Sequence, residues 1–325
     1  MADSDYFNLC DSLNDKQRDY LMHVLNAFKL QELPVYHFVS GGAGVGKSRL
    51  IKALYQSLIR FYRRVPGPVE SPEVLIVAYT GKAAHNVGGI TAHTAFSLPM
   101  VTSQEMKGLG PEALNTLRVK LAKVKLIIID EISMLGSGTL DKIHKRLVQV
   151  FQVKKPFGGK SVITLGDLNQ IKPVKDEYVF KPGKSDVQRM IGNPLWELFK
   201  LFELTEIMRQ KDDLKFAEGL SRLAIGELND DDIKMFKSRC FSESITGTGS
   251  RSNVPALPQE GKDAIRLMWK NVDVASYNSR RLKELETQDS VRIIFTAIDN
   301  VIGGISQVDK RQALFNLKNK TTQQT

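Results

Sequence analysis

The feature that most constrains this chain is a short apolar segment that runs directly into a glycine loop. Residues 35–40 read Val-Tyr-His-Phe-Val-Ser and predict a strand, and residues 41–48 match the pattern G-x-x-x-x-G-K-S/T. Four apolar residues at helical spacing predict that a helix follows: Leu50, Leu54, Leu58 and Phe61. Glycines let backbone N–H groups turn inward around an anion, and a helix start adds positive potential. This order predicts a nucleoside triphosphate site; the alternative is a glycine loop that matches by chance.

Each part of the loop has an expected role. The backbone would surround the phosphates, Lys47 would reach the β- and γ-phosphates, and the Ser48 hydroxyl would bind Mg²⁺. The residues expected to bind the nucleotide are Gly41, Gly42, Ala43, Gly44, Val45, Gly46, Lys47 and Ser48. The expected cofactors are therefore ATP and Mg²⁺.

Four further apolar segments predict strands, at residues 74–79, 126–130, 161–165 and 201–204. Continuous apolar runs are typical of strands that are buried on both faces of a parallel sheet. Because helical patterns separate most of these segments, we expect an α/β protein with a doubly wound, mostly parallel sheet. Such sheets bind ligands at the carboxyl ends of their strands, and polar residues follow each predicted strand. One site built from five strand ends is expected.

Two acids and a glutamine follow these strands in positions that suit phosphate chemistry. Asp130 is expected to bind Mg²⁺, and Glu131 to act as the general base that activates water. Gln170 would contact the γ-phosphate or the attacking water, and Arg209 would add positive charge near the γ-phosphate. The alternatives are a solvated acid pair, an ordinary loop glutamine and a surface arginine.

A second group of polar residues suits contact with a sugar-phosphate backbone. Thr80, Gly81 and Lys82 follow a predicted strand and offer a hydroxyl, backbone N–H groups and a positive charge. His93 and Thr94 would extend this surface, and Phe96 would stack on a base. The alternative for Phe96 is an ordinary core residue.

The charge of the chain agrees with a polyanionic partner. The net charge is +10 over 325 residues, while 42% hydrophobic and 25% charged residues are typical of a globular protein. Only two cysteines occur, so neither a disulfide framework nor a zinc site is expected. No apolar run approaches the roughly 20 residues that a membrane span needs, and the N-terminus lacks a signal pattern. We expect an intracellular protein without a membrane partner.

Several of these motifs stand in an order that resembles the PIF family of DNA helicases, in superfamily 1B near the RecD-like enzymes. The resemblance covers roughly residues 14–240. Its most specific part is Glu131-Ile132-Ser133-Met134-Leu135, because generic P-loop ATPases do not require this extension of the acid pair. The other segments that carry it are residues 41–48, 78–84, 88–96, 166–174 and 204–210.

The resemblance implies a RecA-like P-loop fold and ATP-driven 5′-to-3′ movement along single-stranded DNA. It further implies binding to single-stranded DNA and DNA junctions without sequence specificity, roles in recombination, repair after DNA damage and telomere maintenance, and a nuclear location. Gln17 matches a glutamine that contacts adenine in the family, although it also fits a capping box with Asn14. Lys172 replaces the usual proline of its motif and would add a phosphate contact.

The resemblance also sets the expected domains. Residues 1–34 would form an N-terminal helix that carries Gln17, residues 35–241 the first RecA-like ATPase domain, and residues 242–262 a linker. Residues 263–325 would be an incomplete second RecA-like domain with a basic tail, in which residues 272–275 are a candidate strand and residues 279–286 a candidate helix. No motif of the second domain is recognisable after Ser290.

Because that domain looks incomplete, we expect weak binding of ATP and DNA, slow hydrolysis and no unwinding by this chain alone. The alternatives are a truncated, nucleotide-regulated DNA-binding fragment, and a P-loop ATPase or kinase that acts elsewhere. Stimulation of ATP hydrolysis by DNA separates the last of these from the other two.

Overall fold

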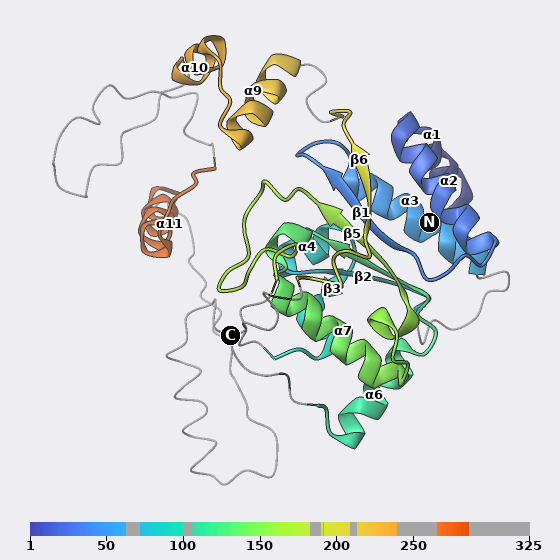
Figure 1. Ribbon diagram of the computed structural model, residues 1–325. Helices are drawn as coiled ribbons and strands as arrows, with labels where there is room; N and C mark the ends of the chain where they lie inside the picture. The colour runs from blue at the N-terminus through green and yellow to red at the C-terminus, as the bar shows by residue number, and fades with distance from the viewer. Residues whose placement is uncertain are drawn as a thin grey trace, which may run out of the picture. The chain divides into compact units, whose positions relative to one another are not determined.

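A six-stranded, all-parallel sheet forms the centre of the first of two structural units (Figure 1). The computed structural model describes residues 1–62, 72–99, 106, 108–182, 190, 192–208, 213–238 and 265–285. The first unit is Met1–Cys240 and the second is Phe241–Thr325. The strands are β1 (Tyr36–Gly41), β2 (Val74–Ala78), β3 (Ile90–Thr91), β4 (Leu126–Asp130), β5 (Ser161–Gly166) and β6 (Lys200–Leu204).

The strand order is β3-β2-β4-β5-β1-β6, so β1 lies between β5 and β6. Every residue of β2, β4 and β5 is buried, which explains why these strands are mostly apolar. Parallel neighbours need crossover connections, and helices supply most of them here. The predicted doubly wound α/β fold is confirmed, and the five predicted strands are all present.

Helices cover both faces of the sheet, and alternate residues of each strand enter opposite cores. Val39 and Ile128 pack in one core with α2 (Asp15–Lys29) and α3 (Lys47–Tyr62), whereas Phe38 and Ile127 pack in the other. Helices α5 (Ala92–Phe96), α6 (Pro111–Leu121) and α7 (Ser137–Phe151) supply the second core. The remaining short elements of this region are α1 (Asp3–Asp11), α4 (Gly81–Asn86), η1 (Ile132–Met134) and η2 (Pro156–Gly159).

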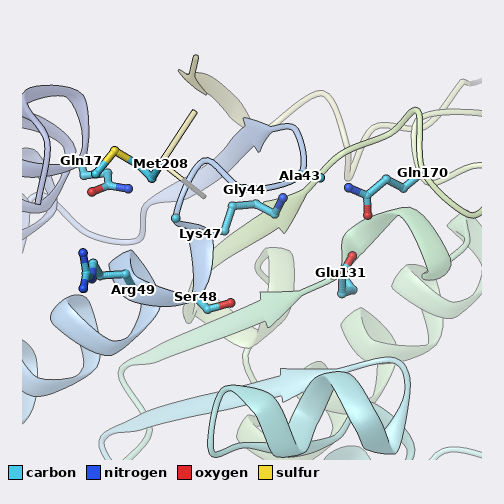
Figure 2. Close-up of a pocket in the computed structure, with 10 residues that line it drawn as sticks. Gln17, Ala43, Gly44, Lys47, Ser48, Arg49, Glu131, Gln170 and Met208 are labelled. Carbon is cyan, nitrogen blue, oxygen red and sulfur yellow. The ribbon is translucent and has the colours of Figure 1, made fainter. Parts of the chain in front are cut away.

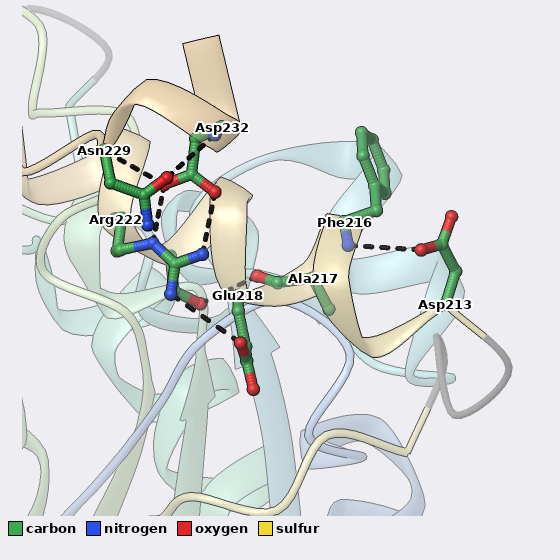
Figure 3. A network of polar contacts seen from close by, with 8 residues as sticks. Asp213, Phe216, Ala217, Glu218, Arg222, Asn229 and Asp232 are labelled. Atoms are coloured by element: carbon green, nitrogen blue, oxygen red, sulfur yellow. Dashed lines mark hydrogen bonds and ion pairs between the residues drawn. The ribbon is translucent and has the colours of Figure 1, made fainter. Parts of the chain in front are cut away.

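A helical hairpin follows the sheet in the chain and is held by its own ion pair (Figure 3). It comprises α9 (Leu214–Ile225) and α10 (Asp230–Lys237). The Arg222 guanidinium donates two hydrogen bonds, of 2.6 and 2.7 Å, to the buried carboxylate of Asp232. Asp232 also completes a capping box with Asn229 at the start of α10. The pairing with Arg222 lowers the pKa of Asp232, so both partners stay charged at neutral pH.

Some parts of the fold differ from the sequence prediction, and others cannot be compared with it. Helix α1 and strand β3 were not predicted, and β3 has only two residues. The predicted strand at residues 272–275 is wrong, because helix α11 covers Asn271–Leu285. Residues 242–262 and 286–325 lie outside the described residues, so the proposed linker and most of the proposed second domain stay predictions.

A buried arginine joins α7 to α5. Arg146 is only 2% exposed, and its guanidinium donates to the carbonyl oxygens of Phe96 at 3.0 Å and Ser97 at 3.2 Å. It also donates to Oε1 of Gln149 at 2.6 Å. Ser97 lies in the left-handed region at φ 49°, where α5 ends, so the arginine satisfies carbonyls that no helical bond can reach. Burial lowers the pKa of Arg146, but an arginine keeps its proton at any physiological pH.

Replacing Arg146 with methionine should destabilise the protein by about 2–4 kcal/mol, because the buried oxygens would lose their donors. The neighbouring variant Lys145→Met is the control, since the exposed Lys145 pairs with a partly exposed Asp141 and its loss should cost at most about 1 kcal/mol. Urea unfolding of both variants measures the difference. Equal midpoints for the two variants would contradict the assigned role of Arg146.

Candidate functional site

The glycine loop lies between β1 and α3, at the carboxyl end of a central strand. Gly44 and Gly46 have φ angles of 83° and 82°, a conformation that residues with a Cβ atom rarely adopt. At Gly41, a Cβ atom would come within 2.6 Å of Cγ2 of Val45. The spacing of glycines that identified the loop in the sequence is therefore required by its backbone path.

Lys47 and Ser48 begin α3 and face the loop. The Lys47 ammonium donates to the carbonyl oxygens of Gly41 at 2.7 Å and Gly42 at 2.9 Å. These bonds hold the positive charge within the loop, beside the start of the helix, where an anion is favoured.

A cavity of about 330 Å³ opens beside the loop and brings together residues from distant parts of the chain (Figure 2). Its lining residues are Gln17, Ala43, Gly44, Gly46, Lys47, Ser48, Arg49, Glu131, Gln170 and Met208. The predicted roles of Lys47, Glu131 and Gln170 require this proximity. Arg49 and Met208 were not predicted, although Arg49 directly follows Ser48 and Met208 lies in the segment 204–210 that the sequence singled out.

The acid pair sits where β4 ends. Asp130 is 5% exposed, and burial raises the pKa of its carboxyl from 3.8 to about 6, with the nearby Glu131 charge adding to the rise and Lys47 opposing it. The backbone N–H of Glu131 donates to Oδ1 of Asp130 at 3.0 Å. Glu131 itself has φ 52°, an uncommon conformation for a residue with a side chain and one that often occurs at functional sites.

The donor set fits a magnesium ion better than a transition metal. Among the described residues, no cluster of three or more His, Cys, Asp or Glu side chains could hold a metal. Mg²⁺ usually binds through one or two protein oxygens together with water and substrate phosphates. The buried Asp130 carboxylate could supply such an oxygen, and Ser48 lines the cavity.

Gln17 joins α2 to the glycine loop. Its Oε1 accepts from the backbone N–H of Asn14 at 3.1 Å, and its Nε2 donates to the carbonyl of Val45 at 2.8 Å. Gln17 is fully buried, and a Cβ atom on Gly46 would overlap its amide. The capping role is therefore present together with a contact to the loop. The contact with adenine stays a prediction.

The segment after β6 closes the other side of the loop. The backbone N–H of Met208 donates to the carbonyl of Gly44 at 2.9 Å, and Nδ2 of Asn14 contacts the Met208 sulfur at 3.6 Å. Arg209 follows immediately but lies outside the described residues. Its predicted role therefore stays a prediction.

The Asp167 side chain forms hydrogen bonds within the loop that follows β5. Asp167 accepts from the backbone N–H of Asn169 at 3.0 Å and from Nε2 of Gln170 at 3.3 Å. This fixes the Gln170 amide at the edge of the cavity that Lys47 also lines.

The predicted DNA contacts lie at the ends of β2 and β3, which are paired neighbours. Thr80 caps α4 through a 3.2 Å bond from Ala83, while Gly81 and Lys82 are exposed in its first turn. Thr94 is exposed on α5, and the ring of His93 meets that of Tyr79 at 5.4 Å. The structure thus brings the two predicted groups together. Lys172 is exposed in the separate loop after β5.

The structure corrects the prediction for Phe96. Its side chain is fully buried in the core with α6 and α7, so its ring presents no face to a base in this structure. The position follows from the short helix α5, whose buried residues Ala92, Ala95 and Phe96 form its inner face. The prediction that Phe96 stacks on a base is wrong.

The chain is similar to known proteins over most of its length. The PIF1-like helicase family matches residues 12–239, which is more than half of the chain. The ATP-dependent DNA helicase PIF1 of Candida albicans is 28% identical over 319 residues, which cover 94% of this chain and 31% of that protein. The chain spans about a third of the length of the curated relatives it matches.

Two solved structures are similar over most of the chain. The crystal structure of the Candida albicans Pif1 helicase matches with a TM-score of 0.62 at 25% identity, covering 94% of this chain and 61% of that one. The Bacteroides Pif1 helicase, solved with ADP-AlF3 and single-stranded DNA, matches with a TM-score of 0.56 at 25% identity, covering 85% and 58%. With the family match over residues 12–239 and this shared RecA-like fold, the chain belongs to the PIF1-like helicase family.

Proposed function

We propose that this chain is the ATP-hydrolysing part of a DNA helicase that moves 5′ to 3′ along single-stranded DNA. The observation that carries the proposal is the single cavity in which Lys47, Glu131 and Gln170 meet. The family membership and a Bacteroides relative solved with ADP-AlF3 and single-stranded DNA support it. We extend the proposal to DNA junctions, to recombination, repair and telomere maintenance, and to a nuclear location.

In the proposed mechanism, the loop amides and Lys47 bind the phosphates of ATP. Ser48 and Asp130 would hold Mg²⁺, which would draw negative charge from the phosphate oxygens. Glu131 orients the attacking water and accepts its proton, and Gln170 contacts the γ-phosphate. Arg209 is proposed to add positive charge there, and Gln17 to contact adenine through the amide that already holds Val45.

The two carboxyls of the acid pair are suited to different tasks because their surroundings differ. Asp130 is buried with a pKa near 6, so a nearby cation is needed to keep it fully ionised in a site of low polarity. Glu131 is only half-buried and lines the cavity, where a water molecule can reach it. This difference supports assigning the metal to Asp130 and the proton transfer to Glu131.

The proposed DNA surface would bind backbone rather than bases. Thr80, Gly81, Lys82, His93 and Thr94 offer hydroxyls, N–H groups and positive charge, all of which suit phosphate and sugar. Lys172 would extend this surface from the loop after β5. Such contacts carry no sequence information, so binding without sequence preference follows.

The decisive experiment measures ATP hydrolysis by the 325-residue chain with and without single-stranded DNA. We expect DNA to raise the rate, and we expect Lys47→Ala to abolish hydrolysis without a change in the thermal unfolding temperature. The fold should survive because Lys47 bonds to loop carbonyls rather than filling a core position. A folded Lys47→Ala protein with the parent rate would contradict the site, and a rate unaffected by DNA would contradict the helicase assignment.

A second test uses the pKa of Asp130. The pKa of Asp130 is higher in the folded protein than in the unfolded chain, so protonation of Asp130 stabilises the fold. This stabilisation is complete below about pH 4 and is lost as the pH rises through about 6. Without Mg²⁺, Asp130→Asn should therefore stabilise the protein at pH 8, by about 3 kcal/mol at most, and much less at pH 4.5. Chemical unfolding at the two pH values measures this. Addition of Mg²⁺ and a nucleotide should stabilise the parent protein more than the variant. A stability difference between variant and parent that is the same at pH 4.5 and pH 8 would contradict the assigned pKa.

A third test concerns the DNA surface. Each single-strand phosphate that a lysine neutralises contributes about −0.7 to the slope of log affinity against log salt. Lys82→Ala should therefore flatten this slope by about that amount, equally for DNAs of different sequence. Binding titrations of two unrelated oligonucleotides at several salt concentrations give the slopes. An unchanged slope, or a loss for one sequence alone, would count against a phosphate contact at Lys82.

A further inference from the structure

The loop after β5 carries Gln170 and Lys172, and a single carboxylate fastens its far end to α7. Oδ1 of Asp176 accepts from the backbone N–H groups of Gly138 at 3.1 Å and of Glu177 at 2.9 Å. Oδ2 accepts from the backbone N–H and the hydroxyl of Thr139, both at 3.0 Å. The half-buried Asp176 thus receives four hydrogen bonds, three of them from the first turn of a helix that lies far from it in the sequence.

Helix α7 depends on this carboxylate because its own cap position is a glycine. Gly136 offers no side-chain bond, and Asp176 bonds the free N–H groups instead. The backbone N–H of Ser137 donates to the carbonyl of Glu177 at 3.0 Å and adds to the same junction. A Cβ atom on Gly136 would overlap the carboxylate of Asp176, so a glycine at this position leaves room for the contact.

The same helix reaches the proposed DNA surface. Arg146, further along α7, bonds the carbonyls of Phe96 and Ser97 at the end of α5, the helix that carries His93 and Thr94. Near its start, the charge of Asp176 adds to burial in raising the pKa of Tyr79, whose ring contacts His93. Asp176 therefore lies where the Gln170 loop, α7 and the end of β2 meet.

We propose that Asp176 is a positioning residue that fixes the loop of Gln170 and Lys172 to α7, and thereby couples the nucleotide cavity to the DNA surface on α5. This inference rests on the proposed function. When Gln170 binds a nucleotide, its loop moves. Because Asp176 fixes the far end of the loop to α7, this movement displaces α7. Asp176 touches neither the nucleotide cavity nor the exposed residues proposed to bind DNA, so its effect falls on the coupling between them.

The test compares four variants of the 325-residue chain. Asp176→Ala removes the contact, Asp176→Asn keeps one acceptor oxygen, and Gly136→Ala pushes the carboxylate away from the opposite side. Asp141→Ala is the matched control, because it removes a partly exposed carboxylate from the same helix, one that forms an ion pair with Lys145 and acts on His144 but does not cap the helix. ATP hydrolysis is measured with and without single-stranded DNA, and DNA affinity with and without a non-hydrolysable ATP analogue.

We expect Asp176→Ala and Gly136→Ala to keep the DNA-free rate within about twofold and to lose about tenfold in DNA stimulation, a size typical of coupling between two sites. The shift in DNA affinity on adding the ATP analogue should shrink in parallel. Asp176→Asn should restore part of the coupling, and Asp141→Ala should match the parent protein.

Two outcomes would overturn the proposal alone while the parent protein is stimulated by DNA. One is full stimulation in Asp176→Ala and Gly136→Ala; the other is an equal loss of both rates, which a purely structural role predicts. If Asp176→Ala does not fold, the same two outcomes are judged in Asp176→Asn and Gly136→Ala, from the ratio of the hydrolysis rates with and without DNA in each variant. A parent protein that hydrolyses ATP without any response to DNA contradicts the proposed function, and the coupling proposal falls with it.

Discussion

The parallel pairing of β1 with β5 on one side and β6 on the other is the constraint on which the site depends. Register pairs Ser40 with both Gly166 and Glu203, so the three strands end at the same level. The glycine loop, the Gln170 loop and the segment after β6 that includes Met208 therefore leave the sheet side by side. This alignment brings together residues that are far apart in the chain, and several of them line the cavity.

The buried charged groups of this unit differ in how fully their charge is compensated. Lys47 bonds carbonyl oxygens of its own loop, and Arg146 bonds carbonyls at the end of α5. Asp130 has only a backbone N–H and the distant charge of Lys47, so burial dominates and its pKa rises. A buried carboxyl with incomplete compensation is a feature that functional sites share, because the missing charge is supplied by a ligand.

Local signals in the sequence predict every strand except β3, and every residue that lines the cavity except Arg49 and Met208. The glycine loop and the buried strands were predictable because each is specified by neighbouring residues. Strand β3 was missed because two residues carry no periodicity, and the strand at residues 272–275 was wrong because a short apolar alternation also fits a helix. The contact of Asp176 with α7 joins positions 37 and 38 residues apart, and no local pattern encodes it.

The double engagement of Gln17 has a consequence for how variation among relatives should be interpreted. One amide caps α2 and holds the carbonyl of Val45, and it fills the space that Gly46 leaves beside it. A glutamate would set a carboxylate against that carbonyl, and a shorter asparagine would reach only one of the two partners. Selection on the loop backbone alone would therefore preserve a glutamine at this position. Conservation of this glutamine among relatives would therefore be explained by the geometry of the loop, and would not by itself indicate recognition of a particular base.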